Sequence, residues 1–131
     1  MSHTITLAAD LPAKPAQLFN MYVNPRLHAA ITGAPVKIAA RVGAHFEAFG
    51  GALSGTILQV VSKRLIVQSW RSTHFGKRDV DSTLVLTFFP HRKGGRIILT
   101  HVNVAEGDYG GVSDGWAKYY FVPWRVYLEG R

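Results

Sequence analysis

Cysteine is absent from the chain, and its absence excludes several kinds of chemistry. Disulfide bonds, thiol nucleophiles and cysteine-ligated metal sites all require this residue. Long hydrophobic runs are also missing, since no segment approaches the roughly 20 apolar residues of a membrane span. The opening segment, MSHTITLAADLPAKP, has neither a basic start nor a continuous apolar stretch, so it does not resemble a signal peptide. We therefore expect a protein of the cytoplasm that is not embedded in a membrane.

Acidic residues are scarce: 8 Asp and Glu stand against 15 Lys and Arg, which gives a formal net charge of +7. A basic balance of this size permits attraction to nucleic acid or to an anionic membrane. The basic residues are scattered, however, and their densest groups are Lys63-Arg64, Lys77-Arg78 and His91-Arg92-Lys93, all in expected turns. We interpret these groups as solvated turn residues and rank nucleic-acid binding last among the functions considered.

Patterns for catalysis and metal binding are scarce as well. GxGxxG and phosphate-loop motifs are absent, and Gly50-Gly51 and Gly94-Gly95 are isolated pairs of the kind found in turns. His74 and His91 fall in expected loops, and no pair of His or acidic residues has the spacing of metal ligands. We expect neither a metal nor a cofactor. Because no acid–base pair is visible, catalysis ranks below binding as a function.

The composition that remains is that of a globular domain. Hydrophobic residues make up 47% of the 131 residues and charged residues 18%. A chain of this length buries about two-thirds of the surface that it exposes when unfolded, which is enough for a core without disulfides. The sequence contains no internal repeat, low-complexity tract or linker, and we expect residues 1–131 to form a single domain.

Two short helices are expected after a first strand at Thr4–Ala8. Pro15 begins the first helix, because proline has no N–H to lose in a first turn. Asn24-Pro25 ends it, because the residue before a proline is pushed out of the helical region. The second helix runs from Pro25 to Ile31 and ends at Thr32-Gly33.

After Pro35 the hydrophobic residues alternate with period two, which predicts a mostly antiparallel meander. The expected strands cover residues 36–40, 45–49, 53–61, 66–71, 84–88 and 97–102. One face of them carries Phe46, Ala48, Leu53, Gly55, Ile57, Ile66, Gln68, Trp70, Leu84, Leu86, Phe88, Ile97, Leu99 and His101. Gly55 on this face predicts a kink or bulge where the sheet bends.

The stretch VSDGWAKYYFVPWRVYL, residues 112–128, predicts a long C-terminal helix that is apolar around most of its circumference. At about 100° per residue, its helical spacing places one apolar set on a common side. This set is Val112, Trp116, Tyr119, Pro123, Val126 and Tyr127. Such a helix must be surrounded, so we expect the sheet to curl around it. Pro123 removes the hydrogen bond to the Tyr119 carbonyl, and we expect a bend there, beside a cavity.

Several segments together resemble a known family over nearly the whole chain. They are Gly33-Ala34-Pro35, Val42-Gly43-x-x-Phe46, Ser54-Gly55, Ile66-Val67-x-x-Trp70-Arg71 and Gly115-Trp116-x-x-Tyr119-Tyr120. In these the chain resembles the C-terminal domain of the activators of the 90-kDa heat-shock protein ATPase and its stand-alone bacterial relatives, within the START-like (SRPBCC) superfamily. The resemblance implies an α+β helix-grip fold. In it, a curved antiparallel sheet of six to seven strands surrounds a long C-terminal helix, and two short helices follow strand one.

Many START-like proteins hold an apolar molecule between sheet and helix, so the resemblance also implies a candidate cavity. We expect its ligand-binding residues to be Phe46, Gln68, Trp70, His101, Trp116, Tyr119 and Tyr120. Gln68 and His101 are polar residues on an apolar face, where an unpaired group costs about 1–3 kcal/mol. Each must therefore find a partner, which is another side chain, a water or a ligand. For both residues a purely structural role in the core is the alternative, and the same holds for the tryptophans.

The leading hypothesis for function is a module that binds an apolar or amphipathic small molecule. A chaperone-related protein-interaction module is the alternative that the resemblance implies. The chaperone activators carry a further N-terminal domain, and we expect 131 residues to leave no room for it, which ranks this alternative second. An enzyme is third. As an assembly we expect a monomer or a homodimer.

Overall fold

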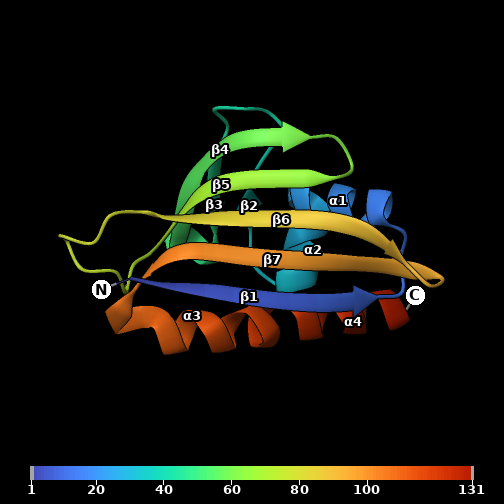
Figure 1. Cartoon of the computed structure of the whole chain (residues 1–131). Coiled ribbons are helices and arrows are strands. Elements are labelled where there is room, and N and C mark those ends of the chain that lie inside the picture. The colour runs from blue at the N-terminus through green and yellow to red at the C-terminus, as the bar shows by residue number, and fades with distance from the viewer. Residues whose placement is uncertain (1, 131) are drawn as a thin grey trace.

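The computed structural model describes residues 2–130 and contains one seven-stranded antiparallel sheet (Figure 1). The strands are β1 (Ser2–Leu11), β2 (Val36–Lys37), β3 (His45–Ala48), β4 (Leu53–Val61), β5 (Leu65–Ser72), β6 (Ser82–His91) and β7 (Gly94–Ala105). Their order across the sheet is β1-β7-β6-β5-β4-β3-β2. Strands β2 to β7 therefore follow one another as a meander, and β1 joins it at the far side of β7. The α+β class and the antiparallel sheet predicted from the sequence are confirmed.

The expected boundaries differ from the observed ones at both edges of the sheet and in the hairpin of β6 and β7, where the strands extend beyond 84–88 and 97–102 to Ser82–His91 and Gly94–Ala105. The first strand extends to both sides of Thr4–Ala8, because it pairs with β7 along its length. The strand expected over 36–40 shrinks to two residues, since only Val36 and Lys37 pair with β3.

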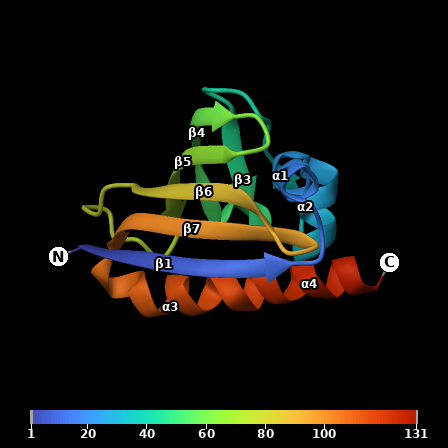
Figure 2. The ribbon, with the colours of Figure 1, turned by 45° about the vertical axis from the view of Figure 1, so that its right-hand side comes forward.

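The sheet curls at β4, and Gly55 is the residue that permits the curl. A Cβ atom at this position would lie 1.9 Å from the backbone oxygen of Ser69 in β5, so only glycine fits. The ladder between β4 and β5 shifts register between Ile57 and Gln59, which places the bulge just beyond Gly55. Figure 2 shows the result: β3 runs steeply across the direction of β6 and β7. The expected kink or bulge at Gly55 is thus a close backbone approach next to a bulge.

Two short helices, α1 (Pro15–Val23) and α2 (Pro25–Thr32), lie at one end of the sheet, as expected (Figure 2). Asn24 separates them, and its side-chain oxygen accepts hydrogen bonds from the backbone N–H groups of Arg26 and Leu27. This is a standard N-cap, which satisfies donors that the first helical turn leaves free. Gly33 ends α2 with φ of 80°, a left-handed conformation that glycine adopts without strain.

The face of the sheet predicted to be apolar forms the core. Of the fourteen residues expected there, all but Leu53 and Gly55 are buried, and these two are half-buried. The partners from the helices include Leu18, Tyr22, Trp116, Tyr120 and Trp124. The alternation in the sequence therefore identified the inner face correctly, because the period of a strand is fixed at two.

The C-terminal helix departs from the expected single α-helix over 112–128. It consists of α3 (Tyr109–Gly115), a π-helical turn η3 (Trp116–Phe121) and α4 (Val122–Glu129), which follow one another along the sheet (Figure 1). The π-turn ends just before Pro123, where the Val122 N–H bonds to the carbonyl of Ala117, five residues back. Single π-turns of this kind occur inside α-helices. The bend expected at Pro123 beside a cavity stays a prediction, and the irregularity that the structure shows is the wider turn over Trp116–Phe121.

The π-turn changes which side chains face the sheet. The buried set is Val112, Trp116, Tyr120 and Trp124, in strict steps of four. On an ideal α-helix, steps of four drift by about 40° each, and the wider turn absorbs this drift. Tyr119 and Val126, which the helical spacing placed on a common side with Val112 and Trp116, are 50% and 64% exposed.

Candidate functional site

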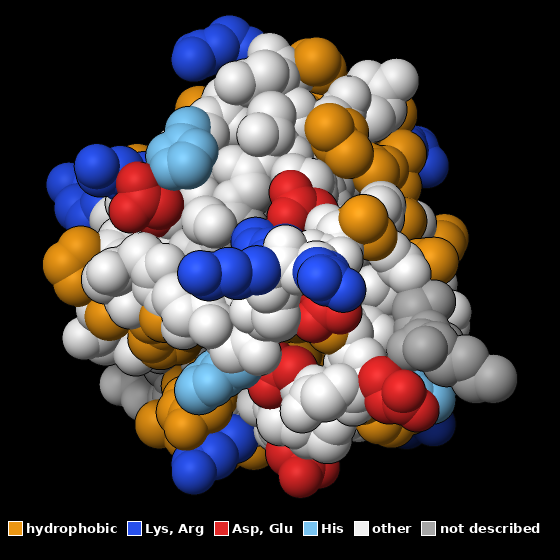
Figure 3. Space-filling model, turned by 90° about the vertical axis from the view of Figure 1, so that its left-hand side faces the viewer, with side chains coloured by type: hydrophobic (Ala, Val, Ile, Leu, Met, Phe, Trp, Pro, Cys, Tyr) orange, Lys and Arg blue, Asp and Glu red, His pale blue; other side chains and the backbone are white. Residues whose placement is uncertain are grey.

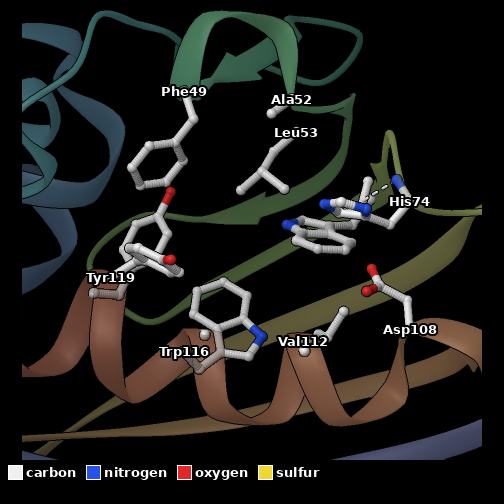
Figure 4. Close-up of a pocket in the computed structure, with 13 residues that line it drawn as sticks. Phe49, Ala52, Leu53, His74, Asp108, Val112, Trp116 and Tyr119 are labelled. Carbon is white, nitrogen blue, oxygen red and sulfur yellow. Dashed lines mark hydrogen bonds between the residues drawn. The ribbon is translucent and has the colours of Figure 1, made fainter.

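A cavity of about 610 Å³ opens between the turn that joins β3 to β4, the end of β5 and the C-terminal helix. Its lining consists of Phe49, Ala52, Leu53, Trp70, Ser72, His74, Asp108, Gly111, Val112, Gly115, Trp116, Tyr119 and Tyr120. The size lies within the range of about 300–1,000 Å³ that is usual for small-molecule sites. In Figure 4, Phe49 and Tyr119 lie on one side of this space, His74 and Asp108 on the other, and Trp116 and Val112 between them on the helix.

One wall of the mouth is an unusual turn, η1 (Phe49–Gly51). Its three residues all have positive φ angles, of 53°, 67° and 92°, and a bulky Phe is rarely found in that region. The turn holds the Phe49 ring edge-on to the Tyr119 ring, with 5.8 Å between the ring centroids. Strained residues persist only where the surrounding structure determines them, and they often lie at ligand sites.

The floor is formed by two tryptophans, one from the sheet and one from the helix. Trp70 in β5 and Trp116 in η3 have ring centroids 6.3 Å apart, and Trp116 lies 4.9 Å from the ring of Tyr120. The indole nitrogen of Trp70 is buried and has no hydrogen-bond partner among the described residues. A buried donor without a partner is costly, and such groups are found at sites that a ligand or a water completes.

The end of the cavity opposite Phe49 is polar. His74 follows β5, and its backbone N–H donates to the Ser72 hydroxyl at 3.1 Å. Asp108 precedes α3, and its side chain makes no capping bond to that helix. The site therefore has an aromatic end and an end that presents a carboxylate and an imidazole.

His101, which the sequence placed on the inner face, is fully satisfied by protein groups. The Trp116 indole N–H donates to His101 Nδ1 at 3.2 Å, so the proton of the neutral ring lies on Nε2, which donates to the Ser82 hydroxyl at 2.8 Å. That hydroxyl in turn donates to the Trp70 carbonyl. Burial lowers the pKa of His101 to about 4, so the ring stays neutral at physiological pH. Its geometry is that of a core histidine behind the cavity wall.

A second buried network joins the short helices to the C-terminal helix. His28 Nδ1 donates to the Tyr22 carbonyl and its Nε2 accepts from the Tyr120 hydroxyl, both at 2.8 Å. The Tyr22 hydroxyl donates to Gln68 Oε1, while Gln68 Nε2 has no partner among the described residues. Burial lowers the pKa of His28 to about 4 and raises the pKa of both tyrosines.

The seven residues predicted as ligand-binding therefore fall into two groups. Trp70, Trp116, Tyr119 and Tyr120 line the cavity, whereas Phe46, Gln68 and His101 lie outside its lining. His28 was not singled out in the sequence, although its i,i+3 spacing to the buried Ile31 places it on the inner side of α2. Phe49, His74 and Asp108 were also missed as site residues, since they lie in turns and beyond strand ends, where periodicity gives no signal.

One short motif was overlooked in the sequence and has no matching context in the structure. Residues 111–115, GVSDG, fit the pattern GxSxG. The serine of a nucleophile elbow sits on a sharp turn from a strand to a helix. Here Ser113 lies inside α3, so the match carries no hydrolase assignment.

Two other features limit the kinds of site present in the described part of the chain. Residues 2–130 contain no group of three or more His, Cys, Asp or Glu side chains placed to hold a metal ion, and none of their helices is long and apolar enough to cross a membrane. On the end of the molecule seen in Figure 3, Lys and Arg side chains are interspersed with Asp and Glu. A polyanion favours a surface of one sign instead.

The comparison with protein families decides the family. The family model for Activator of Hsp90 ATPase homolog 1-like protein matches residues 12–122. The chain belongs to this family. Among curated proteins, it is similar to human Activator of 90 kDa heat shock protein ATPase homolog 1, with 26% identity over 117 residues. The match covers 89% of this chain and 34% of the human protein, so the chain spans about a third of that relative's length.

Solved structures support the fold of this Activator of Hsp90 ATPase homolog 1-like chain. An HSP90 activator from Plasmodium falciparum has a TM-score of 0.85 with 21% identity, and 96% of each chain is covered. An Aha1 dimer from Colwellia psychrerythraea has a TM-score of 0.82 with 12% identity, covering 97% of this chain and 96% of that one. At these identities the likeness establishes the fold, and the expected helix grip is thereby confirmed.

Proposed function

We propose that the domain binds an apolar or amphipathic small molecule in the cavity between the β3–β4 turn and the C-terminal helix. One observation carries this proposal: the 610 Å³ cavity is lined mainly by aromatic and aliphatic side chains and has polar groups at one end. Concave, largely apolar sites with a few polar groups are the usual form of small-molecule sites. The buried Trp70 indole N–H, which has no partner within residues 2–130, supports the same interpretation.

Native mass spectrometry of the purified protein tests this function, together with solvent extraction and analysis of what is released. A cavity-filling variant, Ala52→Phe, places a ring in the lining, and the control Ala117→Phe adds the same ring to an exposed position of the π-turn. We expect a bound molecule in the wild type and in Ala117→Phe, and its loss in Ala52→Phe with an unchanged far-UV CD spectrum. Absence of any bound molecule from the wild type, together with failure of added apolar probes to bind, would contradict the proposal.

A second candidate is a protein-interaction role with the 90-kDa heat-shock protein, which the family favours. The two candidates use different parts of the molecule, since a protein partner requires an exposed surface. ATPase assays of the chaperone with and without this chain distinguish them. Stimulation that persists in Ala52→Phe supports the interaction role, and absence of both stimulation and co-purification counts against it.

A further inference from the structure

The cavity has one aromatic end and one polar end, and this arrangement indicates a class of ligand. The aromatic residues Phe49, Trp70, Trp116, Tyr119 and Tyr120 account for much of its lining. Aromatic walls favour flat ring ligands, because rings pack edge-to-face or offset against one another and add to the burial of apolar surface. A ligand that is mainly a ring system therefore fits the aromatic end better than a flexible alkyl chain does.

The opposite end contains a carboxylate that has no hydrogen-bond or ion-pair partner in the described part of the chain. Asp108 is half-buried, lines the cavity and makes no capping hydrogen bond to α3. Three other carboxylates near this end of the molecule are engaged: Asp81 pairs with Arg71, the backbone N–H of Gly76 donates to Asp79, and Glu106 pairs with His3. Asp114, in α3, is exposed and lies outside the lining. Asp108 is therefore the acidic group that remains available to a ligand in the cavity.

Resting on the function proposed above, we propose that the ligand is an aromatic amine. Its rings lie on the Trp70–Trp116 floor behind Phe49 and Tyr119, and its protonated nitrogen forms a charge-assisted hydrogen bond to Asp108. The aromatic walls assist, since a cation is also attracted to ring faces. Although the chain carries a net charge of +7, charges more than about 8 Å away are largely screened at physiological ionic strength. The nearby Asp108 carboxylate then determines which ligand charge the site prefers.

Lys118 is a cation close to the cavity, and it could favour an anionic ligand instead. Its Nζ lies 5.2 Å from the centroid of the Tyr119 ring, at the aromatic end of the cavity. It is exposed, lies outside the lining and is already in contact with that ring. An anionic ligand would have to turn its charged group toward this end and leave Asp108 unpaired.

Three probes with the same ring distinguish a preference for a cationic, a neutral or an anionic ligand: 1-naphthylmethylamine, 1-naphthalenemethanol and 1-naphthaleneacetate. They are cationic, neutral and anionic at pH 7, and isothermal titration calorimetry with the full chain gives their affinities. We expect the amine to bind about five-fold tighter than the alcohol, as a partly exposed ion pair allows, and the acetate to bind weakest. The preference should fall as NaCl is raised.

The variant Asp108→Asn removes the charge and keeps the shape, and Asp114→Asn is the control, since Asp114 is an exposed carboxylate of α3 outside the lining. Asp108→Asn should abolish the preference for the amine and leave the affinity for the alcohol unchanged, whereas Asp114→Asn should keep both. Equal binding of the three probes, stronger binding of the acetate, or a preference that survives in Asp108→Asn overturns the aromatic-amine assignment, while the cavity remains a binding site. Failure of all three probes to bind, with no molecule found by native mass spectrometry, instead overturns the proposed function.

Discussion

At the scale of single residues, the two glycine-dependent features of the fold have different causes. Gly33 ends α2 in a left-handed conformation, which is a matter of backbone angle. Gly55 has an ordinary φ angle, and its constraint is space, because the Ser69 backbone occupies the place of a side chain. A sequence pattern places both residues in turns or bends, and only the packing of β4 on β5 separates the two reasons.

Replacement of Gly55 by alanine is therefore expected to be strongly destabilising. The added methyl group would lie 1.9 Å from the Ser69 oxygen, so β4 and β5 must separate at the curl of the sheet. We expect a loss of about 3 kcal/mol or more in the free energy of unfolding, the upper end of what overpacking costs. Urea denaturation measures it. The control is Gly107→Ala, where nothing lies within 4 Å of the new Cβ and φ is not positive. A Gly55→Ala protein as stable as Gly107→Ala would disprove the close approach.

The inward polar residues illustrate what the sequence could and could not predict at this scale. Alternation placed Gln68 and His101 on the inner face, and both are completely buried. It also required partners for them, and partners exist: Tyr22 for Gln68, and Ser82 and Trp116 for His101. Which partners these are depends on contacts between residues 15 to 46 positions apart, and no local pattern encodes them.

At the scale of elements, the π-turn gives two adjacent tyrosine side chains different orientations. Tyr120 points inward and donates its hydroxyl proton to His28, and Tyr119 points outward and lines the cavity mouth. An ideal helix with about 100° per residue places Tyr119 on the same side as Trp116, and the wider turn separates the two side chains. The wide turn precedes Pro123, and proline is the only local signal of it.

The pair Tyr120→Phe and Tyr119→Phe tests this division. Loss of the Tyr120 hydroxyl leaves His28 Nε2 buried without a donor, and we expect it to cost about 1–3 kcal/mol. Loss of the Tyr119 hydroxyl should change stability by less than about 0.5 kcal/mol, because that side chain is half exposed. Thermal unfolding followed by circular dichroism compares the two. Equal effects would mean that the π-turn does not fix the orientation of Tyr120 as described.

At the scale of the whole molecule, the sequence was most informative about layers and least informative about the cavity. Period-two alternation, turn residues and the resemblance together predicted the antiparallel sheet, the two short helices and the long C-terminal helix. The cavity is formed where segments distant in sequence meet, namely the η1 turn, the end of β5 and the start of α3. Its polar end depends on His74 and Asp108, which occupy irregular segments without periodicity. For that reason four lining residues were predicted and three other predicted residues lie in the core.

Both buried histidines tie the C-terminal helix to other layers, so the stability of the whole molecule should depend on pH. His28 connects α2 to Tyr120 and His101 connects β7 to Trp116. Burial lowers the pKa of each ring from 6.5 to about 4 in the folded state. Between these values the unfolded chain binds more protons than the folded chain, so stability rises with pH. The contribution is complete above pH 6.5 and is lost as the pH falls toward 4.

As the pH falls from 7 to 5, we expect the lowered pKa of each histidine to reduce the free energy of unfolding by about 2 kcal/mol. Both side chains are at most 1% exposed, so solvent screening does not reduce this figure. Urea denaturation across that range measures the slope, which should fall by about half in His28→Gln and in His101→Gln and nearly vanish in the double variant. His74→Gln, at an exposed position, is the control. Asp10, whose pKa is lowered by its hydrogen bond to Arg96, changes the pH dependence of stability only below pH 5. A wild-type slope that survives in the double variant would show that neutral histidines do not hold the helix against the sheet.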